Sequence, residues 1–159
     1  MDGLPEDKTQ GAACLMTMTL EQLLARDGRL IYKISGISME PMLRQNRDLV
    51  MIRVPKERLK KYDVALYKRG SSYVLHRVIA VREDHYLIRG DNTYVLENVP
   101  DSAVIGVLTM FRRKGREIKV TDKAYLFYAR FWTAIYPLRW CLYWGKRALR
   151  SAARRLRLR

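Results

Sequence analysis

Histidine and cysteine are scarce in this chain of 159 residues, which contains two of each. The cysteines, Cys14 and Cys141, lie far apart in unlike surroundings, so a disulfide framework is not expected. The sequence has no CxxC pair and no histidine-rich cluster, and we therefore predict no metal site and no other cofactor. Internal repeats and low-complexity linkers are absent as well.

Acidic residues are missing from the last part of the chain. From Lys123 to the end there are ten basic residues and no acidic one, out of 31 basic and 16 acidic residues in all. Residues 1–122 therefore account for only +5 of the net charge of +15. A chain with 48% hydrophobic and 30% charged residues has a globular balance and can bury one core. We predict one mildly basic domain with a strongly basic appendage.

The organisation of the chain follows from its turn residues and its hydrophobic segments. Residues 1–10 lack an apolar core, so we expect a flexible arm over residues 1–17, with neither a secretory signal nor a membrane span ahead of the domain. Residues 18–26 fit a short helix that Thr19 caps and Asp27-Gly28 ends. β-Branched and aromatic residues then predict strands at 30–34, 49–54, 64–68, 73–81, 85–88 and 104–112. Strands without intervening helices predict a mostly β, antiparallel domain over residues 18–122.

One segment places a serine where a nucleophile could be held. Ser38 follows Gly36 and precedes Pro41, with hydrophobic residues on both sides and a predicted strand just before it. Glycine permits close approach of the backbone and proline prevents a helix, so the serine can be fixed at the rim of a groove. An ordinary serine at a strand-to-turn junction is the alternative interpretation.

The two histidines lie in different settings. In the segment 73–79, alternation puts Val74, His76 and Val78 on one face of a strand. An imidazole among valines is partly desolvated, which keeps it neutral near pH 7 and able to accept a proton. A histidine merely satisfied at a sheet surface would show the same pattern. His85 fits a hairpin turn and carries little catalytic weight.

Two carboxylates follow His76 and could orient its imidazole. Asp91 stands in Gly90-Asp91-Asn92, a turn in which aspartate commonly bonds its own backbone. Glu97 is expected in a loop that ends at Pro100-Asp101. Either one could be the third member of a nucleophile–base–orienter set. Turn architecture for Asp91 and a solvated loop charge for Glu97 are the alternatives.

Taken in order, these segments resemble the type I signal peptidases, serine endopeptidases that share a fold with the self-cleaving SOS-type repressors. Residues 36–43 are similar to the nucleophile box, residues 76–79 (His-Arg-Val-Ile) to the general-base box, and residues 90–92 to the box after it. Residues 48–50 and 62–64 resemble two intervening strands, although Arg47 and Tyr62 stand where relatives have glycine. The matches cover about residues 30–108.

The base box resembles the endoplasmic-reticulum and archaeal-like branch, which uses a Ser-His pair where most bacterial relatives use Ser-Lys. The resemblance implies Ser38 as nucleophile, His76 as base, and Glu97 at the position of an acidic residue that is aspartate in relatives. It implies the Ser38 backbone N–H as oxyanion donor, and it places Gly36 where some relatives have a hydroxyl donor. Met39 and Pro41 of the same box become candidate substrate-binding residues. The implied substrate is an extended peptide with small residues at the cleavage site.

The appendage, residues 123–159, is aromatic and basic, and helical in character. Two arginines and a proline (Arg130, Pro137 and Arg139) interrupt the apolar stretch 124–144, which leaves a membrane span marginal. Aromatic residues joined to an Arg-rich tail fit an amphipathic segment in the interface of an anionic membrane. Two alternatives remain: a helical hairpin that packs on the domain or on a partner, and a helix that spans the membrane.

The sequence therefore predicts a membrane-associated, prokaryotic serine endopeptidase that cleaves signal or leader peptides. One variant is a cytosolic, membrane-associated peptidase that trims leaders from specialised peptides. The competing class is a non-catalytic basic protein that binds membranes or nucleic acid, because the pI near 10.2 favours polyanions. No zinc-finger, RNA-recognition or helix-turn-helix pattern supports specific nucleic-acid binding.

Overall fold

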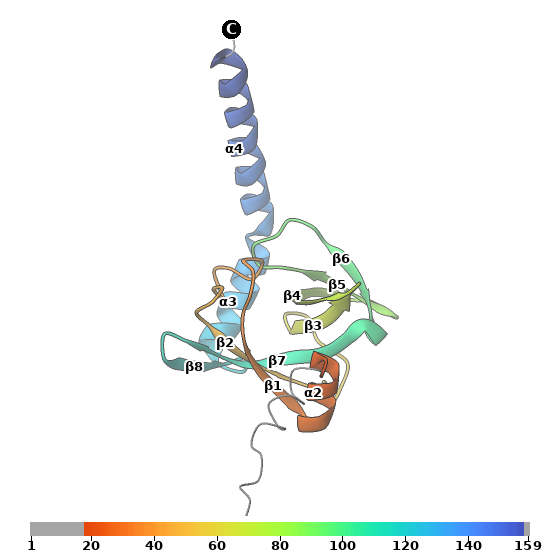
Figure 1. Cartoon of the computed structure of the whole chain (residues 1–159). Helices are drawn as coiled ribbons and strands as arrows, with labels where there is room; N and C mark the ends of the chain where they lie inside the picture. The colour runs from red at the N-terminus through yellow and green to blue at the C-terminus, as the bar shows by residue number, and fades with distance from the viewer. Residues whose placement is uncertain (1–17, 158–159) are drawn as a thin grey trace, which may run out of the picture.

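A computed structural model describes residues 18–157 of the chain as an antiparallel sheet of eight strands with three α-helices (Figure 1). The strands are β1 (Arg29–Lys33), β2 (Leu49–Arg53), β3 (Val64–Arg69), β4 (Ser72–Val81), β5 (His85–Arg89), β6 (Glu97–Pro100), β7 (Val104–Arg113) and β8 (Arg116–Lys119). The α-helices are α2 (Leu20–Asp27), α3 (Lys123–Ala134) and α4 (Tyr136–Arg157), and a 3-10 turn η1 covers Asp101–Ala103. The prediction of a mostly β, antiparallel fold is confirmed. The expected arm, residues 1–17, and Cys14 lie outside the described residues.

Helix α2 begins and ends through local hydrogen bonds. The Gln22 N–H donates to Thr19 Oγ1 at 3.2 Å, and the Thr19 N–H donates to Gln22 Oε1 at 2.8 Å. This reciprocal pair is a capping box, which satisfies two otherwise unpaired amides. Gly28 ends the helix with a φ of 66°, a left-handed conformation that glycine adopts without a Cβ penalty. The predicted cap and stop are both confirmed.

The order of strands in the sheet is β1-β2-β7-β3-β4-β5-β6, with β8 paired to β7. All six predicted strands are present, and their ends differ from the prediction by one residue at most. The expectation of a loop at Glu97 is wrong, because Glu97 is the first residue of β6 and pairs with Ile88 of β5. Strand β8 was also not predicted.

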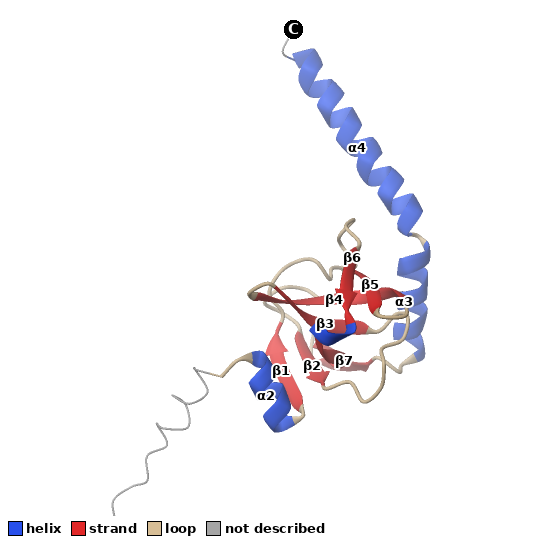
Figure 2. Cartoon of the chain, turned by 90° about the vertical axis from the view of Figure 1, so that its right-hand side faces the viewer, coloured by secondary structure: helices blue, strands red, loops and turns tan. Residues whose placement is uncertain are grey.

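Two buried clusters form the core. The first joins α2, the segment after β1, strands β2, β3, β4 and β7, and α3, and the second joins strands β3 to β6. Helix α3 lies against the body through Tyr125 and Ala129, whereas α4 continues from it and extends away (Figure 2). The appendage is therefore helical, but α3 and α4 do not fold back as a hairpin (Figure 2). Within residues 18–157, none of the helices combines the length and the hydrophobicity that a membrane span requires.

Candidate active site

A cavity of about 690 Å³ opens between the segment after β1, the β3–β4 hairpin and the segment before β6. Its lining includes the three residues that the sequence assigned to a nucleophile, a base and an orienting acid: Ser38, His76 and Glu97. The remaining walls are largely apolar, and they include Leu20, Tyr32, Ile34, Tyr73, Leu75 and Val95. The fold thus brings the three residues from three separate segments to one cavity.

The segment that carries Ser38 is held in place by its backbone. The Asn92 N–H donates to the Ser38 carbonyl oxygen at 2.8 Å, and Asn92 Nδ2 donates to the Ile37 carbonyl oxygen at 3.2 Å. Met39 and Leu43, further along the same segment, are buried in the first core cluster. Ser38 itself stays partly exposed at the cavity. Both sides of the serine are therefore anchored while its side chain remains accessible.

His76 lies in the middle of β4 and is 4% exposed. Burial lowers the pKa of its imidazole below the ordinary value, and the nearby negative charge of Glu97 opposes that shift in part. The Nδ1 side of the ring faces Tyr67 and Glu97, with the Tyr67 hydroxyl oxygen at 3.1 Å and Glu97 Oε1 at 3.4 Å. The ring is therefore neutral near pH 7, as a general base must be.

Gly90 allows the Ser38 segment and His76 to approach each other closely. A Cβ placed on Gly90 would lie 2.6 Å from the Ser38 carbonyl oxygen and 3.0 Å from His76 Nε2. Both groups therefore lie within 3.0 Å of one point, and only a glycine leaves that point empty. Among the hydrogen bonds of residues 18–157, none joins the Ser38 hydroxyl to His76. A role of the pair as nucleophile and base would require that contact to form on ligand binding.

Of the two candidate carboxylates, Glu97 lies beside His76 and Asp91 does not. Glu97 also accepts hydrogen bonds from the Tyr67 hydroxyl at 2.9 Å and from Arg69 Nη1 at 3.1 Å. Asp91 instead accepts two hydrogen bonds from Arg77, from Nε and from Nη2, each at 2.8 Å. The geometry thus makes Glu97 the neighbour of the imidazole and gives Asp91 a structural partner.

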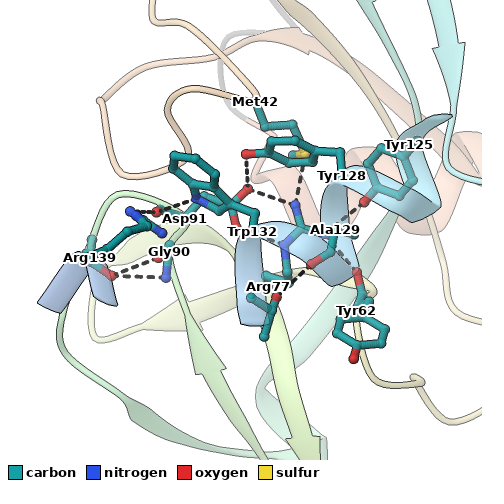
Figure 3. Close-up of polar contacts among 12 residues, drawn as sticks. Met42, Tyr62, Arg77, Gly90, Asp91, Tyr125, Tyr128, Ala129, Trp132 and Arg139 are labelled. Atoms are coloured by element: carbon teal, nitrogen blue, oxygen red, sulfur yellow. Dashed lines mark hydrogen bonds and ion pairs between the residues drawn. The ribbon is translucent and has the colours of Figure 1, made fainter. Parts of the chain in front are cut away.

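Arg77 and Asp91 form a buried network that joins five parts of the fold (Figure 3). Arg77, which is 0% exposed, also donates to the Tyr62 carbonyl oxygen at 3.0 Å, to Tyr125 Oη at 3.2 Å and to Met42 Sδ at 3.0 Å. Asp91 receives a further hydrogen bond from the Tyr128 hydroxyl at 3.1 Å. The network connects β4, the loop before β3, the segment that carries Ser38, the turn after β5 and helix α3, and so fixes Ser38 relative to His76.

The other residues singled out from the sequence have clear positions. The Gly36 N–H donates to Gln45 Oε1 at 3.0 Å, so this amide is already used within the chain. The Ser38 N–H makes no hydrogen bond within residues 18–157 and can therefore donate to an oxyanion. Met39 lines the cavity and Pro41 does not.

Two further residues named in the sequence analysis lie away from the cavity. His85 forms an exposed pair with Asp84 at 2.6 Å, and it is the first residue of β5 instead of lying in a turn. Cys141 is an exposed free thiol.

Sequence reasoning missed Tyr67, Arg69 and the role of Gly90. The β3–β4 hairpin pairs Arg69 with Ser72, and this register sets Ala65 opposite His76. Tyr67, two residues from Ala65, therefore shares the face of His76 as a diagonal neighbour. A two-residue turn at Gly70-Ser71 would have given that register from the sequence. Gly90 gave no such signal, because its role depends on contacts from Ser38, 52 positions earlier.

Comparison with known proteins adds no family to this picture: no family model matches the chain, and no curated protein matches it significantly.

Proposed function

We propose that the chain is a serine endopeptidase that cleaves signal or leader peptides by acyl transfer. The observation that carries the proposal is the convergence of Ser38, His76 and Glu97 on one cavity from three separate segments. The sequence boxes at residues 36–43, 76–79 and 90–92, which occur in the order typical of signal peptidases, support it. On the same basis we propose that the antiparallel fold is signal-peptidase-like. The cavity wall is mainly apolar, which suits an extended peptide with small apolar side chains at the cleavage site.

The chemistry assigns a task to each group. Ser38 Oγ forms a bond to the scissile carbonyl carbon while His76 Nε2 takes the hydroxyl proton. The Ser38 N–H donates to the oxyanion, an interaction typically worth about 3–4 kcal/mol. The C–N bond then breaks as the imidazolium returns the proton to the leaving amine. Water, activated by the same imidazole, hydrolyses the acyl-enzyme and regenerates Ser38. Glu97 stabilises the transient imidazolium.

Labelling with p-nitrophenyl acetate, an acylating ester, tests the proposal. Mass spectrometry of the digested protein should place the acetyl group on the peptide that contains Ser38. Ser38→Ala should abolish that label, and His76→Ala should slow its formation by about 100-fold or more, since general-base assistance contributes 10²–10⁴-fold. Equal labelling of all three proteins would refute the peptidase assignment.

A second observation favours membrane association of this peptidase. Four side chains of α3 and α4 form what we call the outer stripe, with exposed fractions of 71% (Phe127), 50% (Phe131), 61% (Leu138) and 54% (Leu142). Phe127 and Phe131 are four residues apart on α3, and Leu138 and Leu142 are four residues apart on α4, so each pair lies on one face of its helix. The opposite face, with Trp132, Tyr136 and Arg139, contacts the body. An exposed apolar face among cationic side chains fits an anionic lipid interface.

A further inference from the structure

The buried hydroxyl of Tyr67 lies between the proposed base and its carboxylate. Tyr67 extends from β3 and is 1% exposed. Its oxygen is 2.9 Å from Glu97 Oε2 and 3.1 Å from His76 Nδ1, and the direct distance from Nδ1 to Glu97 Oε1 is longer, at 3.4 Å. Each of the two hydrogen bonds through the phenol is therefore shorter than the direct contact between the imidazole and the carboxylate.

The direction of both hydrogen bonds follows from the number of protons available. A carboxylate can only accept, so the single phenolic proton is donated to Glu97. The Tyr67 oxygen is then left as an acceptor for His76, and the ring must carry its proton on Nδ1. Burial and the adjacent carboxylate raise the pKa of Tyr67, so the phenol keeps its proton.

This arrangement decides which nitrogen can act as the base. With the proton on Nδ1, the lone pair is on Nε2, the nitrogen that lies nearest the Gly90 gap beside Ser38. His76 lines the cavity, and its Nε2 makes no hydrogen bond within residues 18–157, so this nitrogen is free to accept one. The opposite tautomer would present an N–H to the serine and could not accept its proton.

We propose that Tyr67 is a positioning residue that holds His76 in the Nδ1–H tautomer and links it to Glu97. The proposal rests on the proposed function for its kinetic consequence but not for the tautomer itself. Arg69, which bonds Glu97 Oε1 at 3.1 Å, keeps the carboxylate directed at the pair. A chain of two hydrogen bonds in a buried site also strengthens each member through polarisation.

The test compares Tyr67→Phe with Tyr86→Phe. Tyr86 is equally buried in the same core cluster, and its hydroxyl accepts the Leu59 N–H at 3.1 Å without touching His76. Nitrogen-15 NMR of the imidazole, above its pKa, should show the Nδ1–H tautomer in the wild type and in Tyr86→Phe. Tyr67→Phe should shift the ring toward the Nε2–H tautomer that free histidine favours.

Acylation by p-nitrophenyl acetate supplies the kinetic measurement. Tyr67→Phe should reduce the rate constant for Ser38 acylation by roughly 10- to 100-fold with little change in KM, while Tyr86→Phe stays within about twofold of wild type. An unchanged tautomer in Tyr67→Phe would overturn the positioning role, as would equal acylation rates for the two variants. If the wild type is not acylated at Ser38, the peptidase assignment fails, and the NMR result still decides the tautomer.

Discussion

A single methyl group at Gly90 should separate the nucleophile from the base. The added Cβ of Gly90→Ala would lie 2.6 Å from the Ser38 carbonyl oxygen, a backbone atom that cannot rotate away. The nucleophile segment must therefore shift, and a displacement near 1 Å can cost about 100-fold in rate. We expect at least that loss in the acylation of Ser38. Gly145→Ala is the matched control, because a Cβ there meets nothing within 4 Å. A wild-type rate in Gly90→Ala would contradict the close approach.

The pH dependence of acylation should report the burial of His76. Its pKa lies below the ordinary value, mainly through desolvation and despite the opposing charge of Glu97. The neutral imidazole is the active form, so the rate should be constant at neutral pH and should fall as the pH drops through this lowered pKa. Glu97→Gln removes the charge that stabilises the imidazolium. Its midpoint should therefore lie at lower pH than that of wild type.

The pH–rate profile is measured with p-nitrophenyl acetate for wild type, Glu97→Gln and Glu117→Gln. Glu117 pairs with Arg112 on the surface and does not line the cavity, so its profile should coincide with that of wild type. A midpoint that rises in Glu97→Gln would mean that the carboxylate does not act on His76. An alkaline midpoint for the wild type would exclude His76 as the base.

At the scale of elements, the buried pair Arg77–Asp91 should hold the site together. Asp91→Asn removes the charge that compensates a guanidinium with 0% exposure, and breaking such a pair typically costs about 3–5 kcal/mol. The free energy of unfolding, measured by denaturant titration, should fall by that amount. Asp101→Asn is the control, because its pair with Arg58 is roughly 40% exposed on each side and should contribute under about 1 kcal/mol. Equal losses in the two variants would contradict the structural role of Asp91.

The elements that the sequence predicted are those with strong local signals. Helix α2 has a cap and a glycine stop, and the six predicted strands carry β-branched and aromatic runs. Strands β6 and β8 were missed because each has four residues with little hydrophobic pattern, Glu-Asn-Val-Pro and Arg-Glu-Ile-Lys, and forms by pairing with a neighbour. The sequence boxes indicated Ser38 and His76 as candidates, and both residues line the cavity. The choice between Asp91 and Glu97 could not be made from the sequence, since it depends on which side of β4 each carboxylate reaches.

At the scale of the whole molecule, helix α4 joins the cavity to the outer stripe. The ring of Tyr94 stacks on Tyr143 of α4 at 4.5 Å between centroids, and the Tyr136 hydroxyl donates to the Tyr94 carbonyl oxygen at 3.2 Å. Thr93 and Val95, on either side of Tyr94, line the cavity. The segment that forms one cavity wall therefore packs against the face of α4 that carries Tyr136 and Tyr143. The opposite face, with the outer stripe, remains available for a partner.

Removing two side chains of the outer stripe should release the protein from anionic vesicles. Phe131→Ser with Leu138→Ser deletes apolar groups worth roughly 1.5 kcal/mol each at a lipid interface, which corresponds to about 100-fold weaker binding. Ile31→Ser is the control, because Ile31 is exposed to a similar extent (56%) on β1, outside the stripe and the cavity. Co-sedimentation with phosphatidylserine-containing and with neutral vesicles, over a salt series, measures the effect.

Binding to the anionic vesicles should weaken as salt screens the ten basic residues of the appendage. Equal binding of the double variant and wild type, or stronger binding to DNA than to vesicles, would exclude the stripe as a lipid-binding surface. Acylation of Ser38 should be unchanged throughout, since none of the substituted residues lines the cavity.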